Sequence, residues 1–173
     1  MYGDYTQDLP AGCAGFGPLP RLHVTMGAMP NEAHFRRLER LYRTGPINQF
    51  IISSVAVSAG QAEVTLKPEP HYQHGGGVLH GAIYFKALDD ACVFAVASQV
   101  DDAVVTTATF NVTFARPYTG DLLVATGRLL HASRRLFVAE AEIHDDEGRL
   151  VAKGNGTFMK TGHALRPDPE ASA

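Results

Sequence analysis

The residues best suited to chemistry lie in one stretch, His74-Gly-Gly-Gly-Val-Leu-His80-Gly81, and in the apolar run Ile83 to Val96 that follows it. A glycine-rich loop that opens into a helix leaves backbone N–H groups without partners. Such groups can hold an anion, or the negative charge that develops on a carbonyl oxygen under attack. The run is apolar on nearly all sides, which is typical of a buried helix, yet it contains Asp89. A carboxylate there is costly unless it has a partner or a role, so the stretch predicts an acyl-transfer site.

Gly81 and Asp89 have complementary roles if the reaction is an acyl transfer. The Gly81 N–H lies at the helix start, where the helix dipole favours negative charge, and is the natural donor to the carbonyl oxygen. Asp89 is the natural general base or nucleophile. Eight residues separate them, about 12 Å at ~1.5 Å per residue, so one carbonyl group cannot contact both within a chain. If both act, each site combines Gly81 of one chain with Asp89 of another, which predicts a homodimer with sites at the subunit interface.

Three neighbouring positions have a structural interpretation beside the functional one. Thr107 falls on the polar face of its strand and is a candidate to hold the attacking water, although threonine is also simply a good strand residue. His80 would orient the loop, and a structural histidine that bonds the backbone fits equally well. Asp90 lies one helical turn after Lys86, so a solvated or Lys86-paired charge is expected there.

The rest of the chain predicts strands around one long helix. Residues 31–43 are predicted to form a short amphipathic helix capped by Asn31. Strict alternation of apolar and polar residues in 106–116 predicts a half-buried strand. Five more strands are expected at 50–57, 61–68, 122–131, 135–144 and 150–160. The order of two strands, a helix and four strands indicates an antiparallel sheet wrapped around a buried helix, preceded by an arm over residues 1–30.

Four motifs of this chain, in this order, resemble those of the hotdog-fold acyl-CoA thioesterases. The resemblance is to the PaaI-like group, named for the phenylacetate-degradation thioesterase and related to the 4-hydroxybenzoyl-CoA thioesterases. It covers roughly residues 47 to 160. The motifs are His80-Gly81, the acid Asp89 nine residues later, the turn Phe114-Ala-Arg-Pro117 with Gly120-Asp121, and the strand Gly148 to Thr157.

Two positions depart from the family pattern. Ala82 replaces its second glycine, a mild change because alanine is a good helix former. His74 stands where the family usually has Asn; an imidazole also donates one hydrogen bond to a carbonyl, although it titrates near neutral pH. His74 is therefore a candidate second donor to the thioester oxygen.

The resemblance implies an α+β hotdog fold, with an arm and short helix in 1–45, the thioesterase domain in 46–162 and a tail in 163–173. It implies hydrolysis of an aromatic or short- to medium-chain acyl-CoA, with no cofactor besides the coenzyme A of the substrate. It further implies a homo-oligomer, either a homodimer or a homotetramer built from two such dimers.

The resemblance supports one further site residue, and side-chain chemistry suggests others. The family often has Ser or Thr at the position of Thr107. Ser133, Arg134 and Arg135 are candidates to bind the phosphates of coenzyme A, or form a solvated hairpin. Tyr84 and Phe85 are candidates to line the acyl pocket, or belong to the core.

Composition removes several other classes of function. The net charge of -3 argues against nucleic-acid binding, and no apolar run is long enough to span a bilayer. The N-terminus lacks a signal-peptide pattern, and two cysteines make no disulfide framework, so a cytoplasmic protein is expected. His71, His74 and His80 lack a partner at metal-site spacing, so no metal is expected.

Two alternatives to a thioesterase share this fold. An acyl-thioester dehydratase or hydratase needs a histidine with a downstream acid at another spacing, and fourteen residues after His74 stands Leu88. A non-catalytic acyl-CoA binding module would keep the groove without needing Asp89.

Overall fold

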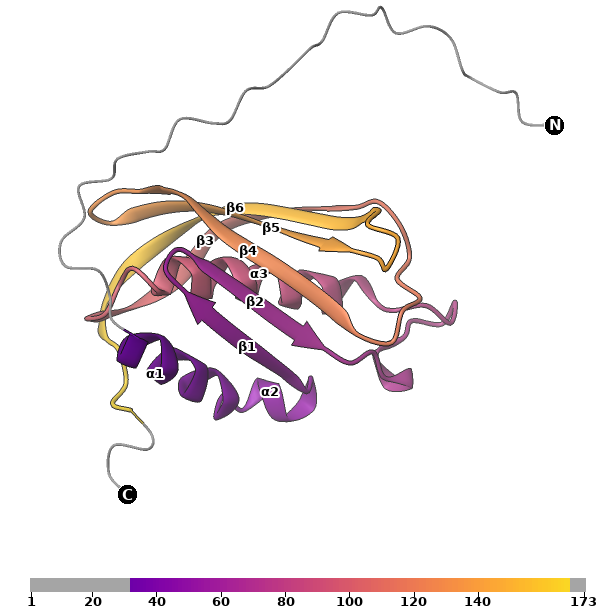
Figure 1. The fold of residues 1–173 in the computed structure, drawn as a ribbon, viewed down its shortest axis with the longest axis horizontal. Helices are drawn as coiled ribbons and strands as arrows, with labels where there is room; N and C mark the ends of the chain where they lie inside the picture. The colour runs from indigo at the N-terminus through magenta and orange to yellow at the C-terminus, as the bar shows by residue number, and fades with distance from the viewer. Residues whose placement is uncertain (1–31, 169–173) are drawn as a thin grey trace, which may run out of the picture.

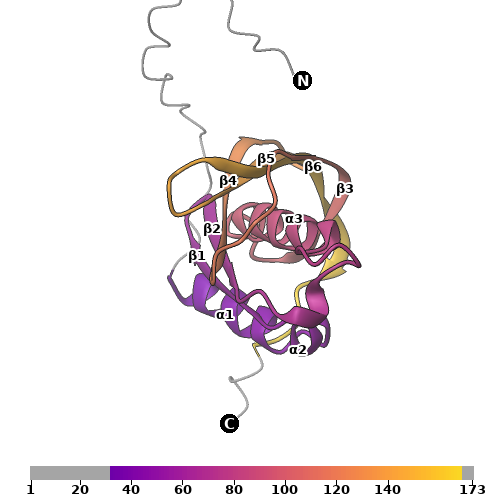
Figure 2. The same cartoon turned by 90° about the vertical axis from the view of Figure 1, so that its right-hand side faces the viewer.

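Helix α3 (Gly81–Ala97) is enclosed by a curled antiparallel sheet (Figures 1 and 2). The computed structural model describes residues 32–168, and within them six strands pair in the order β1-β2-β4-β5-β6-β3. Around α3 lie the remaining elements, α1 (Glu32–Arg43), α2 (Ile47–Phe50), β1 (Ser53–Ser58), β2 (Gln61–Leu66), η1 (Pro70–Tyr72), β3 (Ala103–Phe114), β4 (Leu123–Ala132), β5 (Leu136–His144) and β6 (Leu150–Ala164). The predicted α+β architecture is confirmed.

The core lies between α3 and the concave face of the sheet. Small residues let the helix approach the strands closely: Ala87, Ala91 and Ala95 are fully buried. The tightest contact is at Gly127 of β4, where a Cβ atom would lie 2.4 Å from both the carbonyl carbon and the carbonyl oxygen of Ala91. Only a residue without a side chain fits there, because interiors are packed to the density of organic crystals.

Substituting Gly127 with Ala is expected to lower the free energy of unfolding by about 3 kcal/mol, the upper part of the range for overpacking, because the backbone of α3 would have to move. Chemical denaturation at equilibrium measures this. Gly162→Ala is the matched control, since nothing lies within 4 Å of a Cβ at that exposed position of β6. Equal stabilities for the two variants would contradict the close approach of β4 to α3.

A β-bulge divides strand β3 into two halves. Thr107 pairs with Phe158 of β6, whereas Thr109 pairs with the next residue, Thr157, so Ala108 is one residue too many. An extra residue reverses which side chains face the helix. Thr107 therefore turns inward, whereas Thr109 faces the outer surface and hydrogen-bonds Thr157 over 2.7 Å between their hydroxyl oxygens. The expectation that Thr107 shares the polar face of Thr109 is wrong.

Helix α1 lies beneath the sheet and packs against β1 and α3 (Figure 2). Its predicted apolar stripe is buried at Phe35, Leu38 and Tyr42. The proposed cap Asn31 lies outside the described residues. None of the helices within residues 32–168 is long and apolar enough to span a membrane.

A short helix precedes β1 and overlaps the first predicted strand at its first residue, Phe50. Residues 47–50 form α2, and β1 begins at Ser53 rather than at Phe50. The Asn48 side-chain amide donates to the carbonyl oxygen of Tyr42 over 2.6 Å, which ties α2 to the end of α1. Phe50 is 75% exposed, so its apolar character reflects neither a strand nor the core.

Candidate active site

Asp89 lies in the middle of α3 and faces β3. The Thr107 hydroxyl donates a hydrogen bond of 2.9 Å to Asp89 Oδ1, and both side chains are half-buried. Burial raises the pKa of Asp89 above its ordinary value, and the Thr107 hydrogen bond partly offsets this by stabilising the carboxylate. The arrangement gives a carboxylate that accepts a proton more readily than a solvated one, beside a hydroxyl that can also hold a water.

Gly81 is the first residue of α3. The helix is capped by His80, whose Nδ1 accepts a hydrogen bond of 3.0 Å from the Ala82 N–H. The Gly81 N–H has no acceptor within residues 32–168, as expected in a first helical turn. The ring of Phe114 lies beside it, with Cζ 3.4 Å from where a Gly81 Cβ would stand. Gly81 thus presents an N–H donor next to an apolar surface.

His74 and His80 are both oriented by the backbone. The Gly76 N–H donates to His74 Nδ1 over 2.9 Å, as the Ala82 N–H does to His80 Nδ1. A neutral imidazole that accepts at Nδ1 carries its proton on Nε2. The ring centroids lie 6.3 Å apart, so two Nε2–H donors stand close together at the start of α3.

Phe85 connects the two ends of the candidate site. Positions 81, 85 and 89 are separated by four residues each, which places them along one side of the helix. The Phe85 ring is 43% exposed and packs on Phe110 of β3 with 5.4 Å between ring centroids. An aromatic surface therefore runs along the helix between Gly81 and Asp89.

Tyr84, the other aromatic candidate, belongs to the core. It is 4% exposed, and its hydroxyl oxygen accepts a hydrogen bond of 2.7 Å from the Tyr118 N–H. Its ring packs edge-on against Phe114. Tyr84 fixes the turn after β3 and so supports Phe114, a residue that the sequence analysis does not single out for the site. From the sequence, Phe114 could have been found as one of the apolar residues that alternate along β3. Its importance depends on the position of β3 at the edge of the sheet, which the structure shows.

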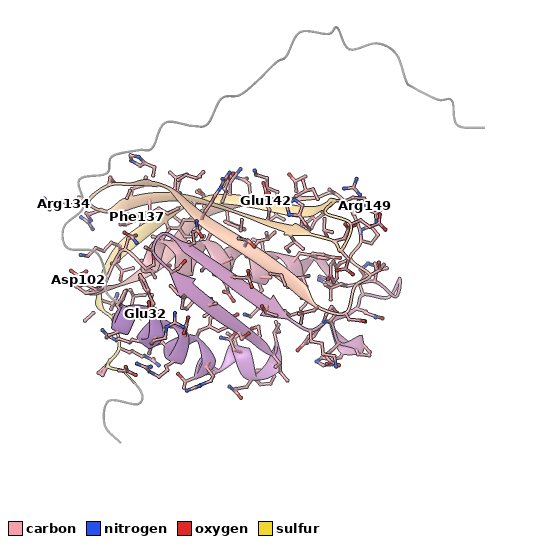
Figure 3. The ribbon with its side chains drawn as sticks, viewed as in Figure 1. Glu32, Asp102, Arg134, Phe137, Glu142 and Arg149 are labelled. Atoms are coloured by element: carbon pink, nitrogen blue, oxygen red, sulfur yellow. The ribbon has the colours of Figure 1, made fainter. Side chains whose placement is uncertain are left out.

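The hairpin Ser133–Arg135 lies away from Gly81. The Arg135 carbonyl accepts from the Lys160 N–H, and Lys160 pairs with Asp102, which follows the C-terminal end of α3. Figure 3 shows Arg134 and Asp102 at one end of the molecule and Arg149 at the other. Within one chain the structure brings Asp89 to Thr107 and His74 to His80, but neither Gly81 to Asp89 nor the arginines to Gly81.

The predicted pair between Lys86 and Asp90 is confirmed, with 2.5 Å between Lys86 Nζ and Asp90 Oδ2. The Tyr42 hydroxyl of α1 also donates a hydrogen bond of 2.9 Å to Asp90 Oδ2, a contact that is not among the predictions from the sequence. Among the described residues, no group of three His, Cys, Asp or Glu side chains could hold a metal ion.

Asp89→Asn is expected to stabilise the fold at neutral pH. Because burial raises the pKa of Asp89 in the folded state, the folded protein binds this proton more tightly than the unfolded chain does. Ionisation of Asp89 therefore removes stability as the pH rises from the unfolded pKa to the higher folded one. Thermal unfolding should show the variant above the wild type at pH 7, by a few degrees at ~2–4 °C per kcal/mol, with the difference shrinking toward pH 4. A variant less stable than the wild type at pH 7 would contradict the direction of the shift.

Comparison with known proteins gives consistent matches. The sequence model of the Thioesterase superfamily matches residues 76–152. The acyl-coenzyme A thioesterase PaaI of Escherichia coli is 30% identical over 115 residues, which cover 66% of this chain and 81% of that protein. The structure of E. coli PaaI covers 80% of this chain and 100% of its own with a TM-score of 0.71 and 21% identity. A conserved protein of Pseudomonas aeruginosa covers 70% of this chain and 98% of its own, with a TM-score of 0.66 and 30% identity.

Proposed function

Because the chain belongs to the thioesterase superfamily, in its PaaI-like hotdog group, we propose that it hydrolyses an acyl-CoA thioester with Asp89 as general base or nucleophile. One observation carries the assignment of the acid. Asp89 is the half-buried carboxylate that contacts Thr107, on the side of α3 that also carries the Gly81 N–H, which has no acceptor among residues 32–168. Asp90 is occupied by Lys86 and Tyr42 and is not the reacting acid.

The proposed chemistry uses donors at the helix start and a carboxylate in its middle. The Gly81 N–H, with Nε2–H of His74, binds the carbonyl oxygen and stabilises its negative charge in the transition state. As a base, Asp89 takes a proton from a water held by Thr107, and that water attacks the carbonyl carbon. The carbon–sulfur bond then breaks, and the proton passes from Asp89 to the thiolate of coenzyme A. As a nucleophile, Asp89 would instead attack the carbonyl carbon and displace the thiolate of coenzyme A as the carbon–sulfur bond breaks, and water would then hydrolyse the resulting anhydride to release the acid and restore Asp89.

We place each site between two chains. The eight residues from Gly81 to Asp89 span about 12 Å along α3, too far for one carbonyl group to contact both. Strand β3 is an edge of the sheet, and exposed edges favour pairing with another chain. Beside that edge Phe114 is 53% exposed and Phe85 43% exposed. A two-fold axis at β3 would bring these rings into the interface and set Gly81 of one chain toward Asp89 of its partner. The pairing of two such dimers would give the tetramer that the family resemblance implies.

The surroundings of this site support an aromatic or short- to medium-chain acyl group. Phe85 and Phe110 form an edge-to-face pair beside Asp89, a surface on which an aromatic ring packs well. Arg134 and Arg135 lie at the C-terminal end of α3, beyond Asp89, and guanidinium groups suit phosphate. We propose that they receive the phosphates of coenzyme A at that end.

Thiol release from a panel of acyl-CoAs with short, medium and aromatic acyl groups tests the proposal. The expected result is turnover with at least one aromatic, short-chain or medium-chain substrate. Binding of coenzyme A without any hydrolysis would favour the acyl-CoA binding module. Hydration of an enoyl-CoA in place of hydrolysis would favour the hydratase, against which stands the fully buried Leu88.

A further inference from the structure

A polar cluster of Tyr42, Lys86 and Asp90 joins α1 to α3. Lys86 Nζ lies 2.5 Å from Asp90 Oδ2 and 3.1 Å from the Tyr42 hydroxyl oxygen, and that hydroxyl donates to the same carboxylate oxygen over 2.9 Å. The Lys86 side chain is 12% exposed and that of Asp90 is 24% exposed. Solvent and salt screen such a partly buried ion pair much less than they screen a pair on the surface.

The cluster is held from outside α3. The Tyr42 ring is 4% exposed and packs edge-on against Phe94 with 5.1 Å between ring centroids. Its hydroxyl also lies 2.7 Å from Ser53 Oγ at the start of β1. Burial and the neighbouring Asp90 charge raise the pKa of Tyr42, so the phenol stays protonated and keeps donating to Asp90. Helix α1 and strand β1 thus fix where the Asp90 charge sits.

On α3, Asp90 follows Asp89 directly and Lys86 precedes it by three residues, so both charges lie within one helical turn of Asp89. Among the described residues these are the charged groups that shift the pKa of Asp89. The negative charge of Asp90 raises the pKa of Asp89, and the positive charge of Lys86 lowers it. From β3 the contact is the uncharged Thr107, whose hydrogen bond lowers the pKa.

The remaining ionisable groups nearby do not supply a competing charge. The Cys92 thiol lies on the same helix, and burial raises its pKa, so it is uncharged at neutral pH. Glu140 of β5 is within electrostatic reach of that thiol and is paired with Arg128 and Lys153.

We propose that the Lys86–Asp90 ion pair, anchored by the Tyr42 hydroxyl, adjusts the pH at which Asp89 ionises, and so the pH range of catalysis, in addition to the larger effect of burial. The inference rests on the proposed role of Asp89. Within the pair each charge offsets part of the effect of the other on Asp89, because Asp90 raises its pKa and Lys86 lowers it, whereas removal of either one leaves the other uncompensated. The two single removals are therefore expected to shift the ionisation of Asp89 in opposite directions, whereas loss of a purely structural salt bridge would affect both variants in the same way.

Four variants test this: Lys86→Met, Asp90→Asn, the double variant, and Lys86→Arg, which keeps the charge. Two readouts are compared, the acidic midpoint of kcat/KM against pH and the carboxyl ¹³C chemical shift of Asp89 against pH. Lys86→Met is expected to raise both midpoints and Asp90→Asn to lower them, each by about one pH unit, the size expected for a nearby charge at an effective dielectric constant near 20. The double variant should return toward the wild type, and Lys86→Arg should stay there.

The outcomes separate this inference from the proposed function. Midpoints that do not move, or that move the same way in both single variants, overturn the inference while leaving hydrolysis intact. Opposite shifts of the Asp89 carboxyl signal in a protein without thioesterase activity would uphold the electrostatic coupling and refute the proposed reaction. Where a single variant fails to fold, the carboxyl titration of Lys86→Gln or Asp90→Ser decides in its place.

Discussion

Asp89→Asn is expected to lower kcat/KM for the preferred acyl-CoA by about 10³-fold, within the range seen when a general base is removed. Asparagine has nearly the shape of aspartate and can still accept the Thr107 hydrogen bond, but it can neither take a proton from water nor attack a carbonyl. The substitution thus removes the reactive group and leaves its surroundings in place. Steady-state thiol release measures the loss.

The matched control is Glu63→Gln, which removes an exposed carboxylate on β2, a strand separated from β3 by three other strands of the sheet. Its kcat/KM should equal that of the wild type. Turnover by Asp89→Asn within tenfold of the control would remove Asp89 from the reaction and direct attention to another base.

Gly81→Pro is expected to lower kcat/KM by about 10²–10³-fold, the usual loss when one oxyanion donor is removed. Proline lacks only the N–H that the proposal requires. It is favoured at the first position of a helix, and the extended backbone of His80 (ψ 141°) is compatible with a following proline. Gly81→Ala keeps the N–H, and its Cβ would make an ordinary contact of 3.4 Å with Phe114. The ratio of the proline to the alanine variant therefore isolates the donor, and a ratio near one would exclude it.

Mixing the two inactive chains tests the location of the site. If each site takes Gly81 from one chain and Asp89 from its partner, a heterodimer of the Gly81→Pro and Asp89→Asn chains contains one intact site. Co-expressed and purified through two different tags, it should recover close to half of the wild-type activity. A heterodimer as inactive as its parents would place both residues of a site in the same chain.

The elements that depend on local patterning could be predicted from the sequence. An apolar run after a glycine loop gives α3, and the spacing of Lys86 and Asp90 gives their ion pair, because both depend on contacts within a few residues. Helix α2 could not be found in this way. Its apolar residues, Phe50 among them, point into solvent, and their apolar character extends the predicted strand back to Phe50, although β1 begins at Ser53.

The parts of the candidate site that were not predictable depend on distant segments. The contact between Tyr42 and Asp90 joins residues 48 positions apart. The inward turn of Thr107 depends on its pairing with β6, some fifty residues later, because the bulge exists only in relation to that partner strand. Alternation within β3 alone assigns Thr107 to the wrong face, although the residue itself is recognised.

The bulge at Ala108 makes one position of β3 tolerant of a shorter chain. Deleting this one alanine would leave Thr107 opposite Phe158 and Thr109 opposite Thr157 in an unbroken ladder, because Ala108 is the residue without a partner in β6. Side chains alternate along a regular strand, so the Thr107 hydroxyl would stay on the side of Asp89 and that of Thr109 on the outer surface. Among single-residue deletions within β3, the removal of Ala108 is therefore expected to disturb the site least.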